Sequence, residues 1–184
     1  MPGSTCLPGL DRSFAQEVKE KSGQSVELCY QCQKCAAGCA MGNFADYAPN
    51  QILRLVQFGA KERVLRSSAI WFCLSCEICS ARCPNDIKIA EIMDVLREMA
   101  LAANVSPVEK RSPLFHRIFL DSVKKRGRVH EAFLIAEYKL KSRDLFSDLG
   151  TGFEMLRKGK LPLLTRGVKN KALVRKIFKR IKES

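Results

Sequence analysis

The chain of 184 residues lacks long apolar runs, and its second half has few acidic residues. No stretch approaches the about 18 consecutive apolar residues of a membrane-spanning helix, so we expect no transmembrane segment. The first ten residues contain no basic region followed by an apolar run. We therefore expect no secretory signal and a cytoplasmic location. No convincing alternation of apolar and polar residues appears either, which argues against strands and predicts an all-α fold.

Cysteine is abundant, with nine residues, and most of these are regularly spaced along the chain. An odd number of cysteines in a reducing compartment indicates metal or redox chemistry rather than a disulfide framework. Eight of them form two runs of the form C-x2-C-x2-C-x3-C, separated by a constant offset of 44 residues. The runs are Cys29, Cys32, Cys35, Cys39 and Cys73, Cys76, Cys79, Cys83. Cys6 stands alone in a stretch rich in Pro and Gly, and we expect it to be a free thiol without a role.

The spacing of each run suits an iron-sulfur cluster. Three thiolates two residues apart can line a tight loop and present three sulfurs to a cubane, while the fourth thiolate is directed elsewhere. Structural zinc is the alternative, but it usually takes two C-x2-C knuckles rather than four cysteines within eleven residues. Pro84 follows Cys83, as at the end of the bacterial ferredoxin run, whereas Ala40 follows Cys39. The spacing therefore favours two 4Fe-4S clusters.

The runs resemble those of two-cluster ferredoxins, in which the fourth Cys of each run ligates the other cluster. This resemblance implies two ligand sets that exchange their fourth members. The first set is Cys29, Cys32, Cys35 and Cys83, and the second set is Cys73, Cys76, Cys79 and Cys39. Such an exchange would clamp the two halves of the domain together and hold the two cofactors close enough for electron transfer.

The residues around the clusters show helical periodicity. Pro49 suits a first helical position, and Gly59 suits a stop. Asp86 is the expected cap of a helix over 89–103, whose apolar stripe is Ile89, Ile92, Met93, Leu96 and Ala100. Further helices are expected over 60–66, from 112 to near 127, and over 129–140, 151–159 and 171–182. Their expected inward residues are Leu114, Phe115, Ile118, Phe119 and Val123; Ala132, Phe133, Ala136 and Leu140; and Leu173, Val174, Ile177, Phe178 and Ile181.

The net charge of +13 lies entirely in one half of the chain. Residues 1–104 carry 11 basic and 11 acidic side chains, whereas residues 105–184 carry 21 basic and 8 acidic side chains. We expect an N-terminal segment with a short helix over 1–24, a two-cluster domain over 25–104, and a basic helical docking region over 105–184. Docking to an acidic protein is favoured over nucleic-acid binding, because no nucleic-acid motif accompanies the charge. Peripheral contact with a membrane stays open.

No substrate site is evident in the sequence, so we expect no catalytic residue on this chain. His116 and His130 lie in helical patterns without a paired carboxylate or nucleophile, which favours structural or surface roles. Gly150-Thr151-Gly152 lacks the third glycine of a dinucleotide-binding loop and follows no strand. Trp71 and Phe72 could tune the clusters by burial, and an ordinary core role explains them equally well.

Several stretches resemble the iron-sulfur electron-transfer subunit of heterodisulfide reductases, component C of those complexes. They are residues 29–39, Ile70-Trp71-Phe72-Cys73, Cys83-Pro84, Ile89-Ala90-Glu91, Gly127-Arg128-Val129, Glu131, Tyr138 and Lys158-Gly159-Lys160-Leu161. The resemblance covers about residues 25 to 165, and the chain departs from the family at Ala40, where proline is usual. The downstream stretches are more specific than the cysteine spacing, which many iron-sulfur proteins share.

This resemblance implies an α-helical ferredoxin-like protein that relays electrons between two partner subunits. One partner, the flavin subunit, contains a flavin and iron-sulfur clusters. The other partner, the Cys-Cys-Gly subunit, reduces the disulfide at clusters that are bound by Cys-Cys-Gly motifs. No two cysteines are adjacent in this chain, so it lacks that motif. The alternatives are the iron-sulfur subunit of a flavin dehydrogenase for a small organic acid, and a cluster-bearing nucleic-acid-binding protein.

Overall fold

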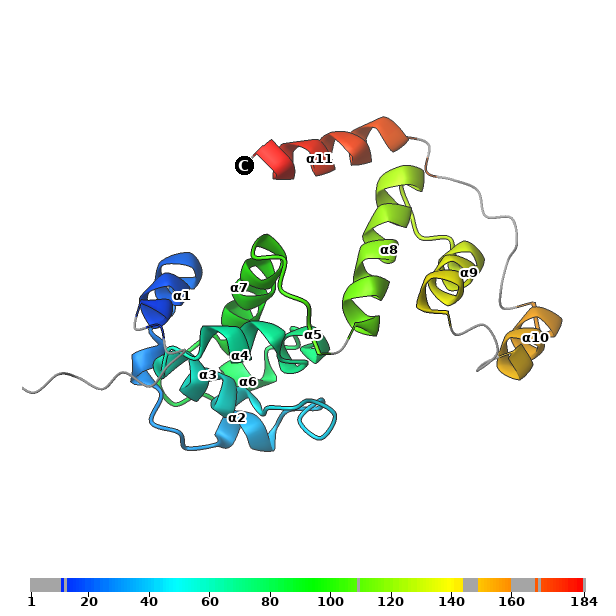
Figure 1. The fold of residues 1–184 in the computed structure, drawn as a ribbon. Helices are drawn as coiled ribbons and strands as arrows, with labels where there is room; N and C mark the ends of the chain where they lie inside the picture. The colour runs from blue at the N-terminus through cyan, green and yellow to red at the C-terminus, as the bar shows by residue number, and fades with distance from the viewer. Residues whose placement is uncertain are drawn as a thin grey trace, which may run out of the picture. The chain divides into compact units, whose positions relative to one another are not determined.

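The computed structural model describes residues 11, 13–108, 110–143, 149–159, 168 and 170–183. Every regular element in this part of the chain is a helix and none is a strand, so the expected helical class is confirmed there (Figure 1). None of the described helices is both long and apolar enough to cross a membrane. The chain divides into two compact units, Met1–Lys110 and Arg111–Ser184.

The first unit contains seven α-helices and one 3-10 helix among its described residues. They are α1 (Phe14–Ser22), η1 (Val26–Leu28), α2 (Lys34–Ala37), α3 (Pro49–Gln57), α4 (Lys61–Arg66), α5 (Ala69–Phe72), α6 (Ile78–Ala81) and α7 (Ile89–Ala102). Helices α1, α3, α4 and α5 contribute to one apolar core against α7, whereas α2 and α6 carry cysteines and pack against each other. The longer helices thus form a scaffold for two short cysteine-bearing turns.

Helix α3 begins and ends where the sequence predicts. Pro49 is the first helical residue, and the backbone N–H of Ala48 donates to Gln51 Oε1 at 2.8 Å. Gly59 follows the helix with a φ of +75°, and a Cβ built on it would lie 2.1 Å from the carbonyl oxygen of Asp11. The Asp11 N–H also donates to the Gly59 carbonyl at 2.7 Å. Only glycine fits this turn, because both its backbone conformation and its close contact with the backbone of Asp11 exclude a side chain.

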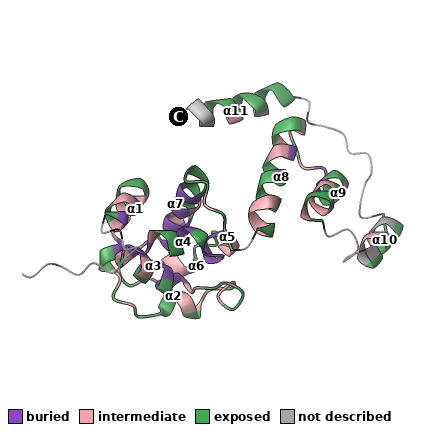
Figure 2. Ribbon diagram, viewed as in Figure 1, coloured by how far each residue is buried: buried purple, intermediate pink, exposed green. Residues whose placement is uncertain are grey.

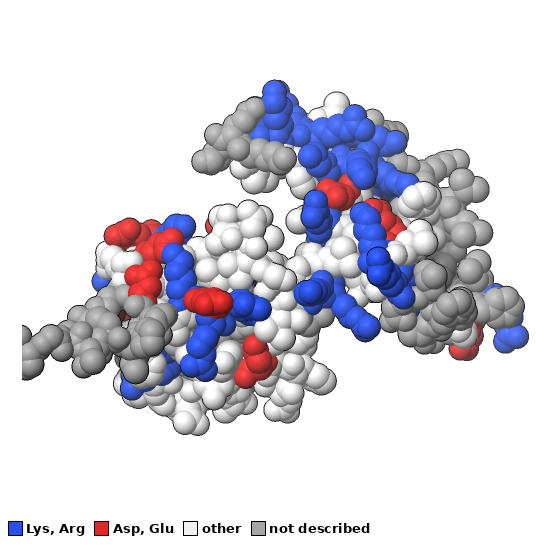
Figure 3. All heavy atoms as spheres, in the orientation of Figure 1, with Lys and Arg blue, Asp and Glu red and all other residues white. Residues whose placement is uncertain are grey.

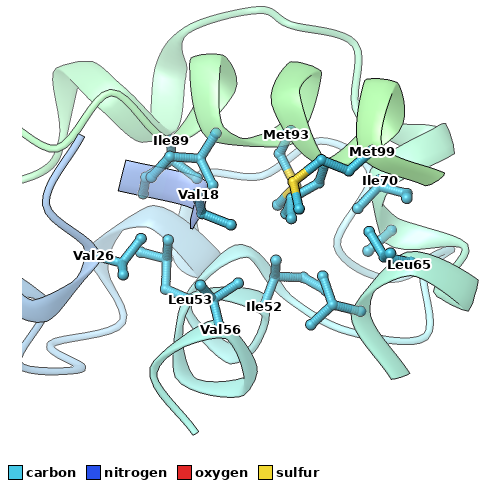
Figure 4. Packing of buried hydrophobic residues seen from close by; sticks show 14 of the residues in the cluster. Val18, Val26, Ile52, Leu53, Val56, Leu65, Ile70, Ile89, Met93 and Met99 are labelled. Carbon is cyan, nitrogen blue, oxygen red and sulfur yellow. The ribbon is translucent and has the colours of Figure 1, made fainter. Parts of the chain in front are cut away.

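Helix α7 supplies the longest face of the core. Its predicted stripe of Ile89, Ile92, Met93, Leu96 and Ala100 is buried throughout, which confirms the helical periodicity. These side chains meet apolar residues of α1 and α3, as Figure 4 shows for Val18, Ile52 and Leu53. Each large side chain buried here stabilises the unit by about 1.5–3 kcal/mol relative to exposure.

The predicted cap of α7 is wrong. The N-cap is Lys88, and no side chain caps the helix. Asp86 lies two residues earlier with a φ of +52°, a conformation that suits the turn after Cys83. A short polar residue tolerates this left-handed conformation better than most, so the position of Asp86 reflects turn chemistry rather than capping.

The second unit contains α8 (Arg111–Arg126), α9 (Glu131–Ser142), α10 (Leu149–Arg157) and α11 (Lys171–Glu183) among its described residues. Helix α8 packs against both α9 and α11. The buried side chains of this unit are few among those described: Ile118, Ser122, His130 and Leu134 (Figure 2).

Most of the predicted inward residues of α8 and α9 are not buried. Of the predicted inward residues of α8 only Ile118 is buried, whereas Phe115 and Phe119 are exposed. In α9 the buried residue is Leu134, and Phe133 is 56% exposed, with the Arg126 guanidinium 3.9 Å from its ring centroid. Apolar residues follow one another along α9, so periodicity alone could not choose its packed face. Of the predicted stripe on α11, Val174 and Phe178 are half-buried and the other residues are exposed.

The remaining predictions for these segments have mixed outcomes. Helix α10 begins at Leu149, two residues before the predicted start at Thr151, so Gly150 and Gly152 lie inside it. His130 is buried and its ring meets that of Phe133 edge-on, while His116 is exposed beside Phe115. Cys6 lies outside the described residues.

Candidate metal centre

The two cysteine runs have the same backbone conformation. Gln31 and Gln33 in the first run have φ values of +64°, and Ser75 and Glu77, 44 residues later, have φ values of +49° and +61°. A left-handed conformation costs a residue with a side chain about 1–2 kcal/mol. Its occurrence in two matched pairs of residues therefore shows that both runs require the same turn. Left-handed and right-handed residues in succession turn neighbouring N–H groups into a concavity that suits anions, as at many iron-sulfur sites.

The two runs lie against each other. Gly38 faces Arg82, and a Cβ built on Gly38 would lie 2.8 Å from Arg82 Cδ and 3.1 Å from Ile78 Cγ2. The missing side chain of Gly38 therefore lets the first run approach α6. On the other side, the Asn85 side chain, just after the second run, donates to the carbonyl of Leu28, just before the first. The structure brings both runs into a single region, as the exchange of ligands requires.

Cys39 lies beside three cysteines of the second run. It lines an apolar pocket together with Cys73, Cys76 and Cys79. The other lining residues are Ala40, Met41, Pro49, Leu74, Ile78, Ile89, Ala90 and Met93. The four cysteines of this pocket are the second ligand set that the ferredoxin resemblance implies.

Cys83 is close to the first run. The pKa of the Tyr30 hydroxyl is raised by desolvation and then by the thiolates of Cys32, Cys83 and Cys29. Residues on both sides of Cys83 also contact the first run: Arg82 faces Gly38, and the Asn85 side chain donates to the Leu28 carbonyl. The fourth cysteine of each run is therefore found near the other run, although the ligand sets themselves stay a prediction.

The third cysteine of each run, Cys35 or Cys79, loses its proton less readily than an ordinary thiol because its pKa is raised. Burial, with the nearby thiolates of Cys29 and Cys79, raises the pKa of Cys35 to about 11. Burial also raises the pKa of Cys79. Both thiols therefore stay protonated near neutral pH in the bare protein, and metal binding releases their protons because its charge offsets that of the thiolates.

The Ser80 hydroxyl indicates that a group with acceptor atoms fits beside Cys79. It lies beside Cys79 and opposes the effect of burial on the pKa of that thiol. It is nevertheless buried and forms no hydrogen bond of normal geometry with any described residue. A cluster sulfide would supply the missing acceptor, so the residues present fit a cubane.

The sulfurs of the described residues are not gathered around a single point. No group of three or more His, Cys, Asp or Glu side chains in this part of the chain is placed to hold one metal ion. A structural zinc ion needs four ligands at about 2.0–2.3 Å from its centre. The four thiolates of a cubane each bind a different iron, so a cluster does not require its ligands to converge on one centre.

Two side chains that the sequence did not single out shape the first run. Gln31 Nε2 donates to Cys29 Sγ at 3.3 Å and to the carbonyl of Asn50 at 3.0 Å. Asn50, which is buried at the start of α3, donates from Nδ2 to Gln31 Oε1 at 3.2 Å. These bonds tie the loop of the first run to the helical scaffold. Neither partner has a sequence signal, because the contact spans 19 residues.

The helix that leads into Cys73 is held by Asp46. Its carboxylate accepts hydrogen bonds from the Ser67 hydroxyl at 2.9 Å, the Ser68 N–H at 2.9 Å and the Ala69 N–H at 3.0 Å. Burial alone would raise the pKa of Asp46, but these bonds outweigh it and lower the pKa. Asp46 thus fixes the first turn of α5 and, through it, the position of Cys73.

One cysteine of each run reaches the surface. Cys32 and Cys76 are exposed. Their neighbours Tyr30 and Leu74, which occupy matched positions in the two runs, are 62% and 64% exposed. A cofactor held here would have its own exposed edge beside an apolar side chain, which suits electron exchange with another protein.

A family model described as 4Fe-4S dicluster domain matches residues 28–88, which include both runs. The region that contains both runs is therefore similar to iron-sulfur domains that hold two clusters.

Curated relatives narrow the class further. Component C of the H2:CoB-CoM heterodisulfide,ferredoxin reductase of Methanothermobacter thermautotrophicus is 33% identical over 102 residues, which is 55% of each chain. Component C2 of the H2/formate:CoB-CoM heterodisulfide,ferredoxin reductase of Methanococcus maripaludis is 37% identical over 99 residues, which cover 50% of this chain and 53% of the relative. Component C of a ferredoxin/F420H2-dependent CoB-CoM heterodisulfide reductase of Methanosarcina acetivorans is 28% identical over 132 residues, 72% of this chain and 76% of the relative.

These comparisons confirm the predicted relationship to component C of heterodisulfide reductases, an iron-sulfur subunit of an oxidoreductase. The chain spans about half the length of the first curated relatives it matches.

Proposed function

We propose that this chain is the electron-transfer subunit of a heterodisulfide-reductase-like complex and holds two 4Fe-4S clusters. The observation that carries the proposal is the pocket in which Cys39 joins Cys73, Cys76 and Cys79. The first cluster would take Cys29, Cys32, Cys35 and Cys83, and the second would take Cys73, Cys76, Cys79 and Cys39. Each cluster, when bound, accepts and releases one electron.

The protein's own residues would position and shield these cofactors. The exchange of fourth ligands fixes the two sites relative to each other, and the scaffold of α3 and α7 carries the loops of both runs. Trp71 is buried and Phe72 half-buried just before Cys73, which keeps water from one side of the second site. Cys32 and Cys76 leave one edge of each site accessible to a partner. No substrate site is proposed on this chain.

The proposed partners are the flavin subunit, which also holds iron-sulfur clusters, and the Cys-Cys-Gly subunit, whose clusters reduce the disulfide. The relatives' names include the CoB-CoM heterodisulfide, and all three described above also include ferredoxin. We propose that the electron acceptor is a disulfide of this kind, reduced on the Cys-Cys-Gly subunit in the cytoplasm. The absence of adjacent cysteines in this chain supports the relay role rather than the disulfide chemistry.

The basic second unit is the proposed docking region. Lys and Arg side chains gather over α8 and α11 (Figure 3). Among the side chains of α11 that the structure describes, the exposed cations are Lys171, Arg175, Lys176, Lys179 and Arg180. Residues 171–182 contain no acidic residue, so this surface complements an acidic patch on a partner protein.

A charge-reversal experiment tests the docking region. Lys176→Glu combined with Arg180→Glu should weaken association with the partner complex, and more strongly at low salt, because exposed charges are screened over about 10 Å at 0.1 M salt. Lys21→Glu in α1, exposed in the first unit, is the matched control. Equal affinities for all three proteins would contradict docking through α11. Retention of the unmodified protein on DNA at physiological salt, lost on removal of residues 166–184, would favour nucleic-acid binding instead.

Iron and sulfide analysis of anaerobically purified protein tests the cofactors. Two cubanes predict about eight irons and about eight acid-labile sulfides per chain, with two paramagnetic resonance signals on reduction. Fewer than about six irons per chain would overturn the two-cluster proposal.

A further inference from the structure

At the start of each cysteine run, one side chain clamps two backbone carbonyls by donating hydrogen bonds to that of the first cysteine and that of the residue three positions before it. Gln57 Nε2 donates to the carbonyl of Val26 at 2.8 Å and to that of Cys29 at 3.0 Å. Arg97 makes the corresponding pair of bonds, from Nε to the carbonyl of Ile70 and from Nη2 to that of Cys73 at 2.7 Å. The carbonyls in the two pairs are related by the same offset of 44 residues as the cysteines.

The clamping side chains themselves do not obey this offset. Gln57 lies on α3, 28 residues after Cys29, and Arg97 lies on α7, 24 residues after Cys73. Two different helices thus make the same contact with the first cysteine of each run. The Val26 carbonyl also accepts the Cys29 N–H at 3.1 Å, so the Gln57 clamp reinforces the turn at the end of η1. Each clamp holds the carbonyl of the first cysteine and thereby fixes where the loop of its run begins.

The two clamps differ in charge. Gln57 is neutral, whereas the guanidinium of Arg97 is always protonated. The Arg97 side chain is 18% exposed, and its ion-pair partner Asp94, at 2.7 Å, is 52% exposed. Water therefore screens the carboxylate more than the guanidinium. Ser75, in the loop between Cys73 and Cys76, donates to the same Asp94 oxygen at 3.2 Å and links the ion pair to the second run.

We propose that Gln57 and Arg97 are positioning residues for the first cysteine of each run, and that Arg97 selectively raises the reduction potential of the cluster held by Cys73. A nearby positive charge stabilises the form that carries the additional electron, and Gln57 supplies no such charge to the other cluster. The clamp thereby biases electrons toward the second site. This inference rests on the proposed function, because it requires two bound clusters.

Two substitutions with opposite expected signs test the charge of Arg97. Arg97→Gln places a neutral amide at the clamp, as at Gln57, and Asp94→Asn removes the counter-charge but retains an acceptor. In redox titrations of the purified complex followed by paramagnetic resonance, Arg97→Gln should lower one of the two midpoint potentials and Asp94→Asn should raise the same one. Arg66→Gln, which removes an exposed arginine from an ion pair with Glu62, is the matched control and should shift neither.

The outcomes separate the inference from the proposed function. If neither Arg97→Gln nor Asp94→Asn shifts either midpoint potential, or if both midpoint potentials shift equally, the proposed role of Arg97 is overturned. Fewer than about six irons in the unmodified chain would instead overturn the two-cluster proposal itself. If Arg97→Gln loses the iron of one cluster, Asp94→Asn still decides the charge effect, because it leaves both clamping bonds intact.

The neutral clamp has its own test. Gln57→Met keeps a side chain of similar length but removes both hydrogen bonds to the carbonyls of Val26 and Cys29. One of the two phases of iron release to a chelator should become faster, and the other should keep its rate. If both phases keep their rates, Gln57 is not a positioning residue.

Discussion

A pair of double cysteine variants tests the exchange of ligands between the runs. In the proposed arrangement, Cys39 and Cys73 bind the same cluster, because Cys39 shares a pocket with the second run. Cys73 and Cys83 bind different clusters, because the residues beside Cys83 contact the first run: Arg82 faces Gly38, and Asn85 donates to the Leu28 carbonyl. Removing two ligands of one cluster therefore has a different consequence from removing one ligand of each.

The expected magnitude follows from the number of ligands left. Cys39→Ala with Cys73→Ala leaves one cluster with two ligands and the other with all four. About four irons should remain per chain, in a cluster with unchanged resonance signal and midpoint potential. Cys73→Ala with Cys83→Ala leaves three ligands at each site, so neither signal should match that of the unmodified protein.

The assay is iron analysis with paramagnetic resonance on anaerobically purified complexes, and the two variants are controls for each other. Each variant removes two cysteines, and each removes Cys73 together with the fourth cysteine of one run. The opposite result would be that the Cys39→Ala, Cys73→Ala variant alters both resonance signals while the Cys73→Ala, Cys83→Ala variant leaves one unchanged. Each run would then bind its own cluster, and the exchange of ligands would be refuted.

Three further predictions concern the scaffold. Asp46→Ala should lower the unfolding free energy of the first unit by about 2 kcal/mol, since three hydrogen bonds to a carboxylate are lost, whereas the exposed Glu62→Ala should change it little in calorimetry. Folding lowers the pKa of Asp46, so its carboxylate stabilises the fold above the pKa of the unfolded state, and this stabilisation is lost as the pH falls through the pKa of the folded state. The difference in unfolding free energy between the unmodified protein and Asp46→Ala should therefore narrow below about pH 4. Gly59→Ala should cost at least about 2 kcal/mol, from its left-handed conformation and a Cβ contact at 2.1 Å; an unchanged melting temperature would contradict this. Leu96→Ala, in the fully buried face of α7, should cost about 2–5 kcal/mol by the same measurement, and a loss below about 1 kcal/mol would refute the packing.

Parts of this structure were predictable because their signals are local. The stripe on α7 repeats over several turns, and Pro49 and Gly59 mark the ends of α3 through backbone constraints that any context imposes. The spacing of the eight cysteines likewise predicts an iron-sulfur domain, which the match over residues 28–88 confirms.

Other parts depend on contacts that no local pattern encodes. Helices α2, α5 and α6 have four residues each, too few to show a helical period. Gln57 and Arg97 bind carbonyls 28 and 24 residues away, so their roles emerge only once the helices are packed. On α9, adjacent apolar residues occupy several faces, and contact with α8 rather than periodicity decides that Leu134 is buried and Phe133 is not.

The proposed relay between two partner subunits can be tested by anaerobic affinity purification of the tagged full chain from its native cells, with identification of the bound proteins. We expect a flavin-containing iron-sulfur protein and a protein rich in Cys-Cys-Gly motifs to co-purify with it. Purification with a flavin dehydrogenase for a small organic acid, and without the Cys-Cys-Gly protein, would refute the relay to a heterodisulfide reductase.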